Sequence, residues 1–255
     1  LKSLKISLPK LVKALKAATI KKPVVIMKVG TTSSGAKAAA SHTGAMAVED
    51  AVIDGVFRQC GVIRARDTEE LFQLGSSFTA LPLPTGRSAA VISSGGGWGV
   101  ESSDLMEARG IALPPLPGES VRFLDSVLPS YWSRKNPVDM VASSNSEAYY
   151  LAVEELIGKP EFDMVFLIGY GVLSSIAVPA LAAADSKYAK KIATLVKAYG
   201  KPIFVVDVLG RDLSESARQF ERAGIPVYRT VRSGVEQAYQ MVRYKEYLSK
   251  KGVKK

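Results

Sequence analysis

The sequence predicts an α/β protein built on a parallel, doubly wound sheet. Short apolar runs such as Pro23 to Met27 and Met164 to Ile168 alternate with longer stretches of helical periodicity. This alternation is typical of strands joined by crossover helices that cover both faces of a parallel sheet. The composition agrees, because 47% of the residues are hydrophobic and only 8% are aromatic, as in globular α/β proteins.

The first block of elements ends near residue 80 and supplies only two strands. Two strands are too few for a sheet covered on both faces, so we interpret residues 1–80 as the last part of a larger domain. Gly61 is a helix stop and Asp67 an N-cap. The elements predicted in this block are helices over 4–18, Ala51 to Cys60 and Thr68 to Phe78, and strands over Pro23 to Met27 and Val62–Ile63.

Residues 81–87 have the Pro- and Gly-containing composition of a linker, and a second β/α series follows over residues 88–255. This series has enough strands for a sheet of its own. Its predicted strands are Ser88 to Ile92, Ile111 to Leu113, Met164 to Ile168, Pro202 to Val208 and Pro226 to Tyr228, with a loop or strand entry at Lys135 to Met140. Its predicted helices are Trp98 to Arg109, Gly118 to Leu128, Ser146 to Ile157, Val178 to Tyr199 with a break, Leu213 to Ala223 and Ser233 to Ser249.

Composition and charge narrow the class of protein. One cysteine and one histidine exclude a disulfide framework and a zinc site of the usual ligand types. We therefore expect no metal site, apart from the carboxylate-and-water type that Mg²⁺ uses, and a reducing, cytoplasmic location. No apolar run approaches the roughly 20 residues of a membrane-spanning helix. The net charge of +10 comes largely from lysines near the two ends; without aromatic–basic interleaving it indicates solvated ends rather than nucleic-acid binding.

The segment Lys28 to Ala47 contains the only histidine, His42. Glycine, alanine and serine dominate this segment, so we predict a mobile, polar loop after the first strand. Ser41 and Thr43 supply hydroxyls beside the imidazole, and Gly44 leads toward a helix whose first amides could bind an anion. An imidazole can act as a nucleophile and form a covalent intermediate. The alternative is a structural or solvated histidine.

A second candidate site follows the strand that opens the second block. Its exposed backbone amides, at the start of a helix, suit a phosphate or a carboxylate. The spacing fits neither a P-loop nor a dinucleotide-binding motif, and the alternative is a tight turn without a ligand. The residues of this candidate are Ser93, Ser94, Gly95, Gly96 and Gly97.

Two further groups are predicted at the same edge of the sheet. Asn136 and Asp139 could point into the crevice at the strand ends, where open α/β sheets bind ligands; the alternative is an ordinary Asx-type turn. The Gly169-Tyr170-Gly171 sequence follows a core strand and could line the same crevice.

Together these motifs resemble the NDP-forming acyl-CoA synthetases, a family that includes the ADP-forming acetate–CoA ligases and is related to succinyl-CoA synthetase. The resemblance rests on AAASHTGAMA, FRQCGVIRARDTEELFQLG, the Ser/Gly-rich loop after a strand, and KNPVDM. It extends from about Lys22 to the C-terminus and is weaker beyond residue 160. It implies flavodoxin-like, succinyl-CoA synthetase-like ligase domains.

The resemblance implies that His42 carries phosphate. In the family, acyl-CoA and phosphate give an acyl phosphate, which phosphorylates the histidine of the SHTGA motif, and the phosphohistidine passes its phosphate to ADP. The reverse direction makes acyl-CoA from acid, CoA and ATP. Phosphoryl transfer needs mainly positioning and charge stabilisation, which fits a mobile loop that carries one imidazole between two anion sites. The implied cofactors are CoA and ADP or ATP with Mg²⁺, bound mainly outside this chain.

The resemblance also implies a domain order. Residues 1–80 correspond to the last part of the first flavodoxin-like ligase domain and residues 88–255 to the whole second one. The expected partners are an N-terminal CoA-binding domain and an ATP-grasp beta subunit or fused domain, in an oligomer. Because the chain begins with Leu1, we expect a fragment that is inactive alone. The family's phosphate-binding helix, and the glutamate that pairs with the histidine, would precede it.

One local departure leaves the ligand of the second loop open. The loop is SSGGGWG here, where the family more often has an Asn-Ala-Gly-Gly-Pro-Gly pattern, so Trp98 stands in place of a proline. The missing glutamate and phosphate-binding helix motivate an alternative to the enzyme. In that alternative the chain is a non-catalytic regulatory or scaffold protein with a degenerate ligase fold.

Overall fold

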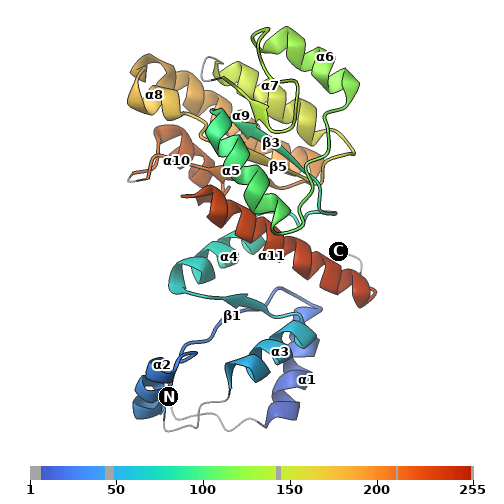
Figure 1. Ribbon diagram of the computed structural model, residues 1–255, viewed down its shortest axis with the longest axis vertical. Helices are drawn as coiled ribbons and strands as arrows, with labels where there is room; N and C mark the ends of the chain where they lie inside the picture. The colour runs from blue at the N-terminus through green and yellow to red at the C-terminus, as the bar shows by residue number, and fades with distance from the viewer. Residues whose placement is uncertain (1–6, 44–48, 142–144, 211, 254–255) are drawn as a thin grey trace. The chain divides into compact units, whose positions relative to one another are not determined.

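The computed structural model describes the backbone of residues 7–43, 49–141, 145–210 and 212–253, and the side chains of all of these except 40–43. The chain divides into two compact units, Leu1–Gly75 with Arg243–Lys255, and Ser76–Val242 (Figure 1). It passes between the units within two helices, α4 (Thr68–Ala80) and α11 (Val231–Lys250). The end of the closing helix therefore groups with the first block, whereas the sequence assigned it to the second. The assignment of the blocks to family domains stays a prediction.

The first unit contains a two-stranded parallel sheet, in which Val25 pairs with Ile63 and Met27 with Ala65. The helix and strand types agree with those predicted, apart from the segment around His42. The elements are α1 (Leu8–Thr19), β1 (Val25–Met27), α2 (Ser33–Thr43), α3 (Asp50–Cys60), β2 (Ile63–Ala65) and the first turns of α4.

Local sequence signals set the ends of these helices. Pro9 lies in the first turn of α1, where its missing N–H removes no intrahelical bond. Gly61 ends α3 with a φ of 70°, a left-handed conformation that glycine adopts without a steric penalty. Asp67 caps α4, because its Oδ1 accepts a hydrogen bond from the Glu70 N–H at 2.8 Å. A small apolar cluster fills the interior of this unit: Leu15, Phe57, Cys60 and Val62.

The segment predicted as a mobile loop contains a helix. Helix α2 includes Ser41, His42 and Thr43 in its last turn, while Gly44 lies outside the described residues. The loop prediction is wrong for Ser33–Thr43 because alanine has the highest intrinsic helix propensity and four of the eleven residues of α2 are alanine. Thr32 also caps the helix: its Oγ1 accepts a hydrogen bond from the Gly35 N–H at 3.1 Å.

The second unit is built on five parallel strands in the order β4-β3-β5-β6-β7. In chain order this is 2-1-3-4-5, the flavodoxin-like arrangement, so the predicted parallel, doubly wound fold is confirmed. Helix α5 lies on one face of the sheet, with α7 and α9 on the other (Figure 1). The elements are β3 (Ala89–Ser93), α5 (Gly96–Glu107), α6 (Gly118–Val127), β4 (Val138–Asp139), α7 (Ser146–Ile157), β5 (Met164–Ile168), α8 (Val172–Ile176), the 3₁₀ helix η1 (Pro179–Leu181), α9 (Ala182–Tyr199), β6 (Ile203–Val206), α10 (Glu215–Arg222) and β7 (Val227–Tyr228).

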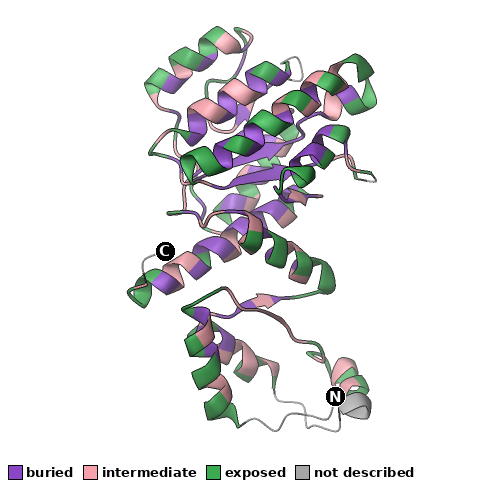
Figure 2. Cartoon of the chain, turned by 180° about the vertical axis from the view of Figure 1, so that it is seen from behind, coloured by how far each residue is buried: buried purple, intermediate pink, exposed green. Residues whose placement is uncertain are grey.

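The sheet itself is the core of the second unit. Every residue of β3 and of β5 is buried, as expected of parallel strands covered on both faces. Phe166 and Phe204 stack between β5 and β6, with ring centroids 4.9 Å apart. Figure 2 shows the buried residues on the strands and on the inner faces of the helices.

The strand predicted at Ile111 to Leu113 is only a single bridge, between Ala112 and Ser88. Pairing stops there because Pro114 follows and has no N–H to donate to a neighbouring strand.

The helical region predicted from Val178 starts earlier, as α8, and is interrupted where Pro179 opens η1. Proline forces this break because it lacks the N–H that a continuing helix would use. Helix α5 begins at Gly96 rather than at the predicted Trp98. Within the described part of the chain, no helix has both the length and the apolar character needed to cross a membrane.

Candidate functional site

The His42 segment begins and ends at one network of ion pairs. Lys28 precedes α2, and its Nζ lies 3.2 Å from Oδ1 of Asp50, the first residue of α3. Arg64, on β2, donates two hydrogen bonds to the Asp50 carboxylate at 2.7 and 2.9 Å, and one to Asp54 at 3.1 Å. The hydrogen bond from Arg64 is the main reason that the pKa of Asp50 lies below its ordinary value. Ion pairs therefore hold both Lys28, which precedes α2, and Asp50, which begins α3, at the same place.

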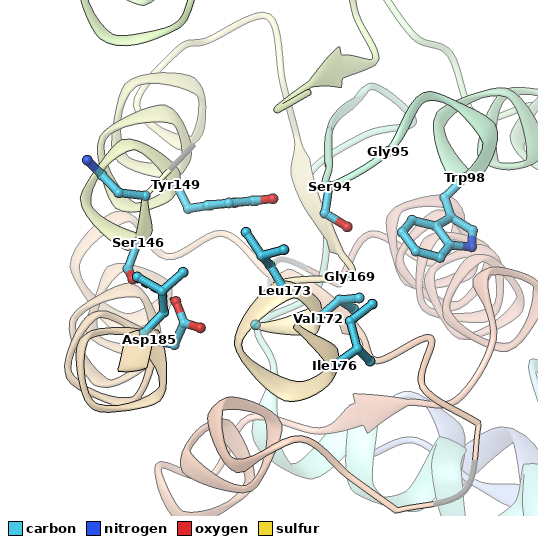
Figure 3. Close-up of a pocket in the computed structure, with 13 residues that line it drawn as sticks. Ser94, Gly95, Trp98, Ser146, Tyr149, Gly169, Val172, Leu173, Ile176 and Asp185 are labelled. Atoms are coloured by element: carbon cyan, nitrogen blue, oxygen red, sulfur yellow. Dashed lines mark hydrogen bonds between the residues drawn. The ribbon is translucent and has the colours of Figure 1, made fainter. Parts of the chain in front are cut away.

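In the second unit, a cavity of about 290 Å³ lies at the carboxyl ends of β3 and β5 (Figure 3). These strands are neighbours in the sheet, and their connections leave toward opposite faces, which is where open α/β sheets bind ligands. The cavity is lined by Ser94, Gly95, Trp98, Asn145, Ser146, Tyr149, Gly169, Gly171, Val172, Leu173, Ile176, Leu181 and Asp185.

Two glycines make room for this cavity. Gly169 has a φ of 74° and Gly171 a φ of 77°, which favours glycine on backbone grounds alone. Space requires it as well. A Cβ on Gly169 would collide with Ser94 Oγ and would lie 3.2 Å from the Trp98 ring, while a Cβ on Gly171 would collide with Ser216 Oγ. Larger residues at either position would therefore displace the cavity wall.

Several polar groups in the cavity wall are already hydrogen-bonded. The Asn145 side chain caps α7 by accepting a hydrogen bond from the Ala148 N–H at 2.9 Å. The Ser146 hydroxyl donates to Oδ1 of the buried Asp185 at 2.6 Å. Ser94 Oγ differs: it is buried and has no hydrogen-bond partner among the described residues.

The Tyr149 hydroxyl points toward Ser94 across the cavity (Figure 3). Burial, more than any other cause, raises the pKa of Tyr149 well above its ordinary value, and it does the same for Tyr170. Both phenols therefore stay protonated and act as hydrogen-bond donors. The Tyr170 hydroxyl is committed to the backbone carbonyl of Asp185, at 2.8 Å, whereas that of Tyr149 faces the cavity.

A second hollow, of about 260 Å³, lies between α5 and the segment that leads into β4. Asp139 accepts a hydrogen bond from the Val141 N–H at 2.8 Å, and a Cβ on Gly96 would lie 2.9 Å from its Oδ2. The carboxylate therefore faces the N-terminal end of α5, whose partial positive charge it stabilises. In this position Asp139 balances the helix end and would repel an anion bound close to it.

The Asn136 side chain holds backbone segments together. Its amide donates to the carbonyls of Ala89 at 2.8 Å and Pro114 at 3.0 Å, and its Oδ1 accepts from the Val91 N–H at 3.0 Å. These three bonds join β3 to the segment after the Ala112 bridge. After these bonds, Asn136 can offer a ligand only the second lone pair of Oδ1, as a hydrogen-bond acceptor.

The predicted site residues fall into two groups. Ser41, His42 and Thr43 belong to the first unit, and the others belong to the second. In the second unit, Ser94 and Gly95 line the cavity, Ser93, Gly96, Asn136 and Asp139 line the hollow, and Gly97 is exposed in the first turn of α5.

The sequence analysis missed Tyr149, Ser146 and Asp185 as cavity residues. They lie on α7 and α9, and helical periodicity assigns them only to a buried face. For Ser146 and Tyr149 the one sequence signal is Asn145, the cap that fixes where α7 begins and therefore which of its residues face the strand ends.

Comparison with known proteins places the chain among the acyl-CoA ligases. Residues 6–78 match the family model of the succinyl-CoA ligase-like flavodoxin domain. An ADP-forming acetate–CoA ligase II alpha subunit from Pyrococcus furiosus is 34% identical over 91% of this chain and 50% of its own length. An ADP-forming 4-hydroxybutyrate–CoA ligase from Nitrosopumilus maritimus is 28% identical over 90% of this chain and 32% of its own length.

A solved structure shares the fold. It is a dinucleotide-forming acetyl-coenzyme A synthetase 1 of Candidatus Korarchaeum cryptofilum in complex with phosphate and ADP. It superposes with a TM-score of 0.82 and 24% identity over 100% of this chain and 55% of that one. The chain thus spans between about a third and about half of the length of these relatives. In sequence and in fold, it is a homologue of the alpha subunits of ADP-forming acetate–CoA ligases, with flavodoxin-like ligase architecture.

Proposed function

We propose that this chain is the phosphohistidine-bearing part of an NDP-forming acyl-CoA synthetase. Acyl-CoA and phosphate would give CoA and an acyl phosphate. A ring nitrogen of His42 would take the phosphoryl group and release the acid, and ADP would then take it from the phosphohistidine to form ATP. The observation that carries the proposal is the position of the only histidine. It lies in the SHTGA motif, within the residues that match the ligase family model.

The ion pairs around Asp50 support a carrier role for this segment. Phosphoryl transfer depends on placing donor and acceptor in line. The ion pairs of Lys28 and Arg64 with Asp50 hold the two ends of this segment in place. They therefore limit the positions that His42 can occupy. In this proposal the carrier is a short helix with anchored ends, not the structureless loop that the composition indicated.

The start of α5 is the second part of the proposal. We place an anionic group of a reactant, phosphate or carboxylate, near the first amides of α5, at Gly96 and Gly97, where the helix end is partly positive. Ser93 supports the turn before them, since its hydroxyl donates to the Gly95 carbonyl at 2.6 Å. The negative charge of Asp139 beside Gly96 means that the anion needs additional positive charge. Lys135, in the wall of the same hollow, can supply part of it, and we assign the rest to a partner domain.

The remaining components are assigned to partners. We expect CoA on an N-terminal CoA-binding domain, and ADP or ATP with Mg²⁺ on an ATP-grasp beta subunit or fused domain, in an oligomeric, cytoplasmic enzyme. Within the described residues, no three His, Cys, Asp or Glu side chains gather into a cluster that could hold a metal ion.

The proposal is tested by supplying the partner domains and ATP labelled at the γ-phosphate. We expect label on the chain that is stable in base and labile in acid, and its loss in His42→Ala. The matched control is Lys37→Ala, an exposed change on the same helix, which should retain the label. Equal labelling of His42→Ala would overturn the assignment. An unlabelled wild-type chain in an otherwise active assembly would favour a non-catalytic ligase-fold protein.

A further inference from the structure

Helix α1 presents a row of lysines to solvent. Its buried side packs into the apolar cluster of the first unit through Leu15. On the opposite side, Lys10, Lys13 and Lys16 follow at intervals of three residues and are all exposed. Ile20, four residues beyond Lys16, continues this face and is 37% exposed. Within the described part of the chain, none of these three lysines forms an ion pair.

Helix α5 presents a row of carboxylates to solvent. Met106, on its buried side, belongs to the core of the second unit. On the opposite side, Glu101, Asp104 and Glu107 are exposed, and Val100 on the same face is 65% exposed. Among the residues that the structure describes, none of these carboxylates has an ion-pair partner.

The two faces match in spacing as well as in charge. From Ile20 back to Lys13, the α1 face has intervals of four and then three residues. From Val100 forward to Glu107, the α5 face has the same two intervals, which correspond to about 6 and about 4.5 Å along a helix. In an antiparallel arrangement, an apolar pair is therefore followed by two opposite-charge pairs. The facing pairs are Ile20 with Val100, Lys16 with Asp104, and Lys13 with Glu107.

The lysines of α9 offer no such match. The Lys187 and Lys191 ammonium groups lie over the Tyr188 ring, 5.6 and 4.9 Å from its centroid. Lys190 and Lys197 are exposed but seven residues apart, which is about 10 Å along the helix. The lysine row that fits the carboxylates of α5 is therefore the one on α1.

We propose that α1 of one copy of this chain docks on α5 of a second copy in this antiparallel register. The Ile20–Val100 contact fixes the register, and the two ion pairs supply attraction between the copies. Exposed ion pairs are individually weak and are screened by salt, so the association is reversible. Because two different surfaces meet, the contact joins copies head to tail. It does not depend on the role of His42.

Sedimentation velocity of the 255-residue chain tests the proposal. The chain is measured over a range of concentrations at ionic strengths of about 0.01 M and about 1 M, where the Debye length is about 30 and about 3 Å. We expect concentration-dependent association at the lower ionic strength and its loss at the higher one. A chain that stays monomeric at the lower ionic strength, or an association that salt does not weaken, would overturn the proposal.

Charge reversal on α1 locates the contact. Lys13→Glu combined with Lys16→Glu should raise the dissociation constant at least about tenfold, because two attractive pairs become repulsive. The control is Lys190→Glu combined with Lys197→Glu on α9, which changes the net charge by the same amount and should associate as the wild type does. An equal loss in the control would show that net charge, and not the α1 face, governs the association.

A charge swap between the two faces is the sharpest test. Asp104→Lys combined with Glu107→Lys should also prevent association when this variant is alone. Mixed with the α1 double variant, it should associate again, because each reversed face then meets a face of opposite charge. Far-UV circular dichroism checks that both variants are folded, and a folded mixture that does not associate would contradict the proposal.

The apolar end of the contact gives a test without any change of charge. Val100→Asn should weaken the association about threefold, because it removes part of an apolar contact, while leaving both charged rows intact. Unchanged association in this variant would contradict the register, even if a charge-reversed variant failed to fold.

Discussion

Ser94 and Gly169 meet at the base of the cavity, where the serine hydroxyl occupies the space that a Cβ on Gly169 would need. Gly169→Ala should therefore destabilise the protein by about 2–4 kcal/mol, the sum of a left-handed alanine and an overpacked contact. Gly200 is the matched control. It has a φ of 63° and nothing within 4 Å of an added Cβ, so Gly200→Ala should cost only about 1–2 kcal/mol.

Urea unfolding of the two variants measures this difference. Adding Ser94→Ala to Gly169→Ala should recover part of the lost stability, because the smaller side chain removes the collision. Equal destabilisation by Gly169→Ala and Gly200→Ala would show that the Ser94 contact is not tight.

Asn136 should prove a structural residue. Asn136→Ala removes three hydrogen bonds to backbone groups and should lower the free energy of unfolding by about 2–4 kcal/mol. Asn145→Ala removes only the α7 cap bond and should cost about 1 kcal/mol. Equilibrium unfolding in urea compares them, and a smaller effect at Asn136 than at Asn145 would refute this role.

Asp163 should make stability depend on pH. Burial alone would raise its pKa, but hydrogen bonds from Ser88 and Thr85 outweigh that effect and leave the pKa below its ordinary value. The Ser88 and Thr85 hydroxyls each lie 2.6 Å from the carboxylate. Because the folded state holds this proton less tightly than the unfolded state, the stabilisation is present above the ordinary carboxyl pKa. It is lost as pH falls through the folded value.

Asp163→Asn should therefore cost about 2 kcal/mol near neutral pH. The difference from the wild type should shrink as the solution becomes acidic enough to protonate Asp163 in the folded protein. Urea unfolding at a series of pH values checks this, and a difference independent of pH would show that the charge of Asp163 contributes nothing.

The network around Asp50 should restrain the His42 segment. Asp50→Asn removes the charge that Lys28 and Arg64 share and should make tryptic cleavage at Lys37 several-fold faster, since local opening governs proteolysis. Global stability should change little, because solvent screens these partly exposed ion pairs. Glu69→Gln, an exposed change on α4, is the control, and equal cleavage rates in both variants would contradict the restraint.

The sequence predicted the sheet of the second unit well, because buried parallel strands are continuous apolar runs. Met164–Ile168 and Ser146–Ile157 match their predicted bounds. It failed where two local tendencies compete. Glycine and serine suggested a loop around His42, but the four alanines and the Thr32 cap favour α2. At Ile111 to Leu113 the β-propensity of the residues is overruled by the prolines that follow.

The candidate site was only partly predictable. The Ser/Gly-rich turn marked the end of β3, because such turns have a distinct composition. Which side chains face the cavity depends instead on packing between helices distant in sequence. Periodicity therefore could not distinguish Tyr149 from a core tyrosine, and it could not show that Asn136 is committed to the backbone of β3.

Phosphoryl transfer from the acyl side tests the central claim most directly. The assembled protein is incubated with a ³²P-labelled acyl phosphate, without nucleotide, and the chain is mapped by tandem mass spectrometry under alkaline conditions. The account predicts one phosphoryl group on His42, discharged when ADP is added and absent from His42→Ala. Label on another residue, or label on His42 that ADP does not remove, would contradict it.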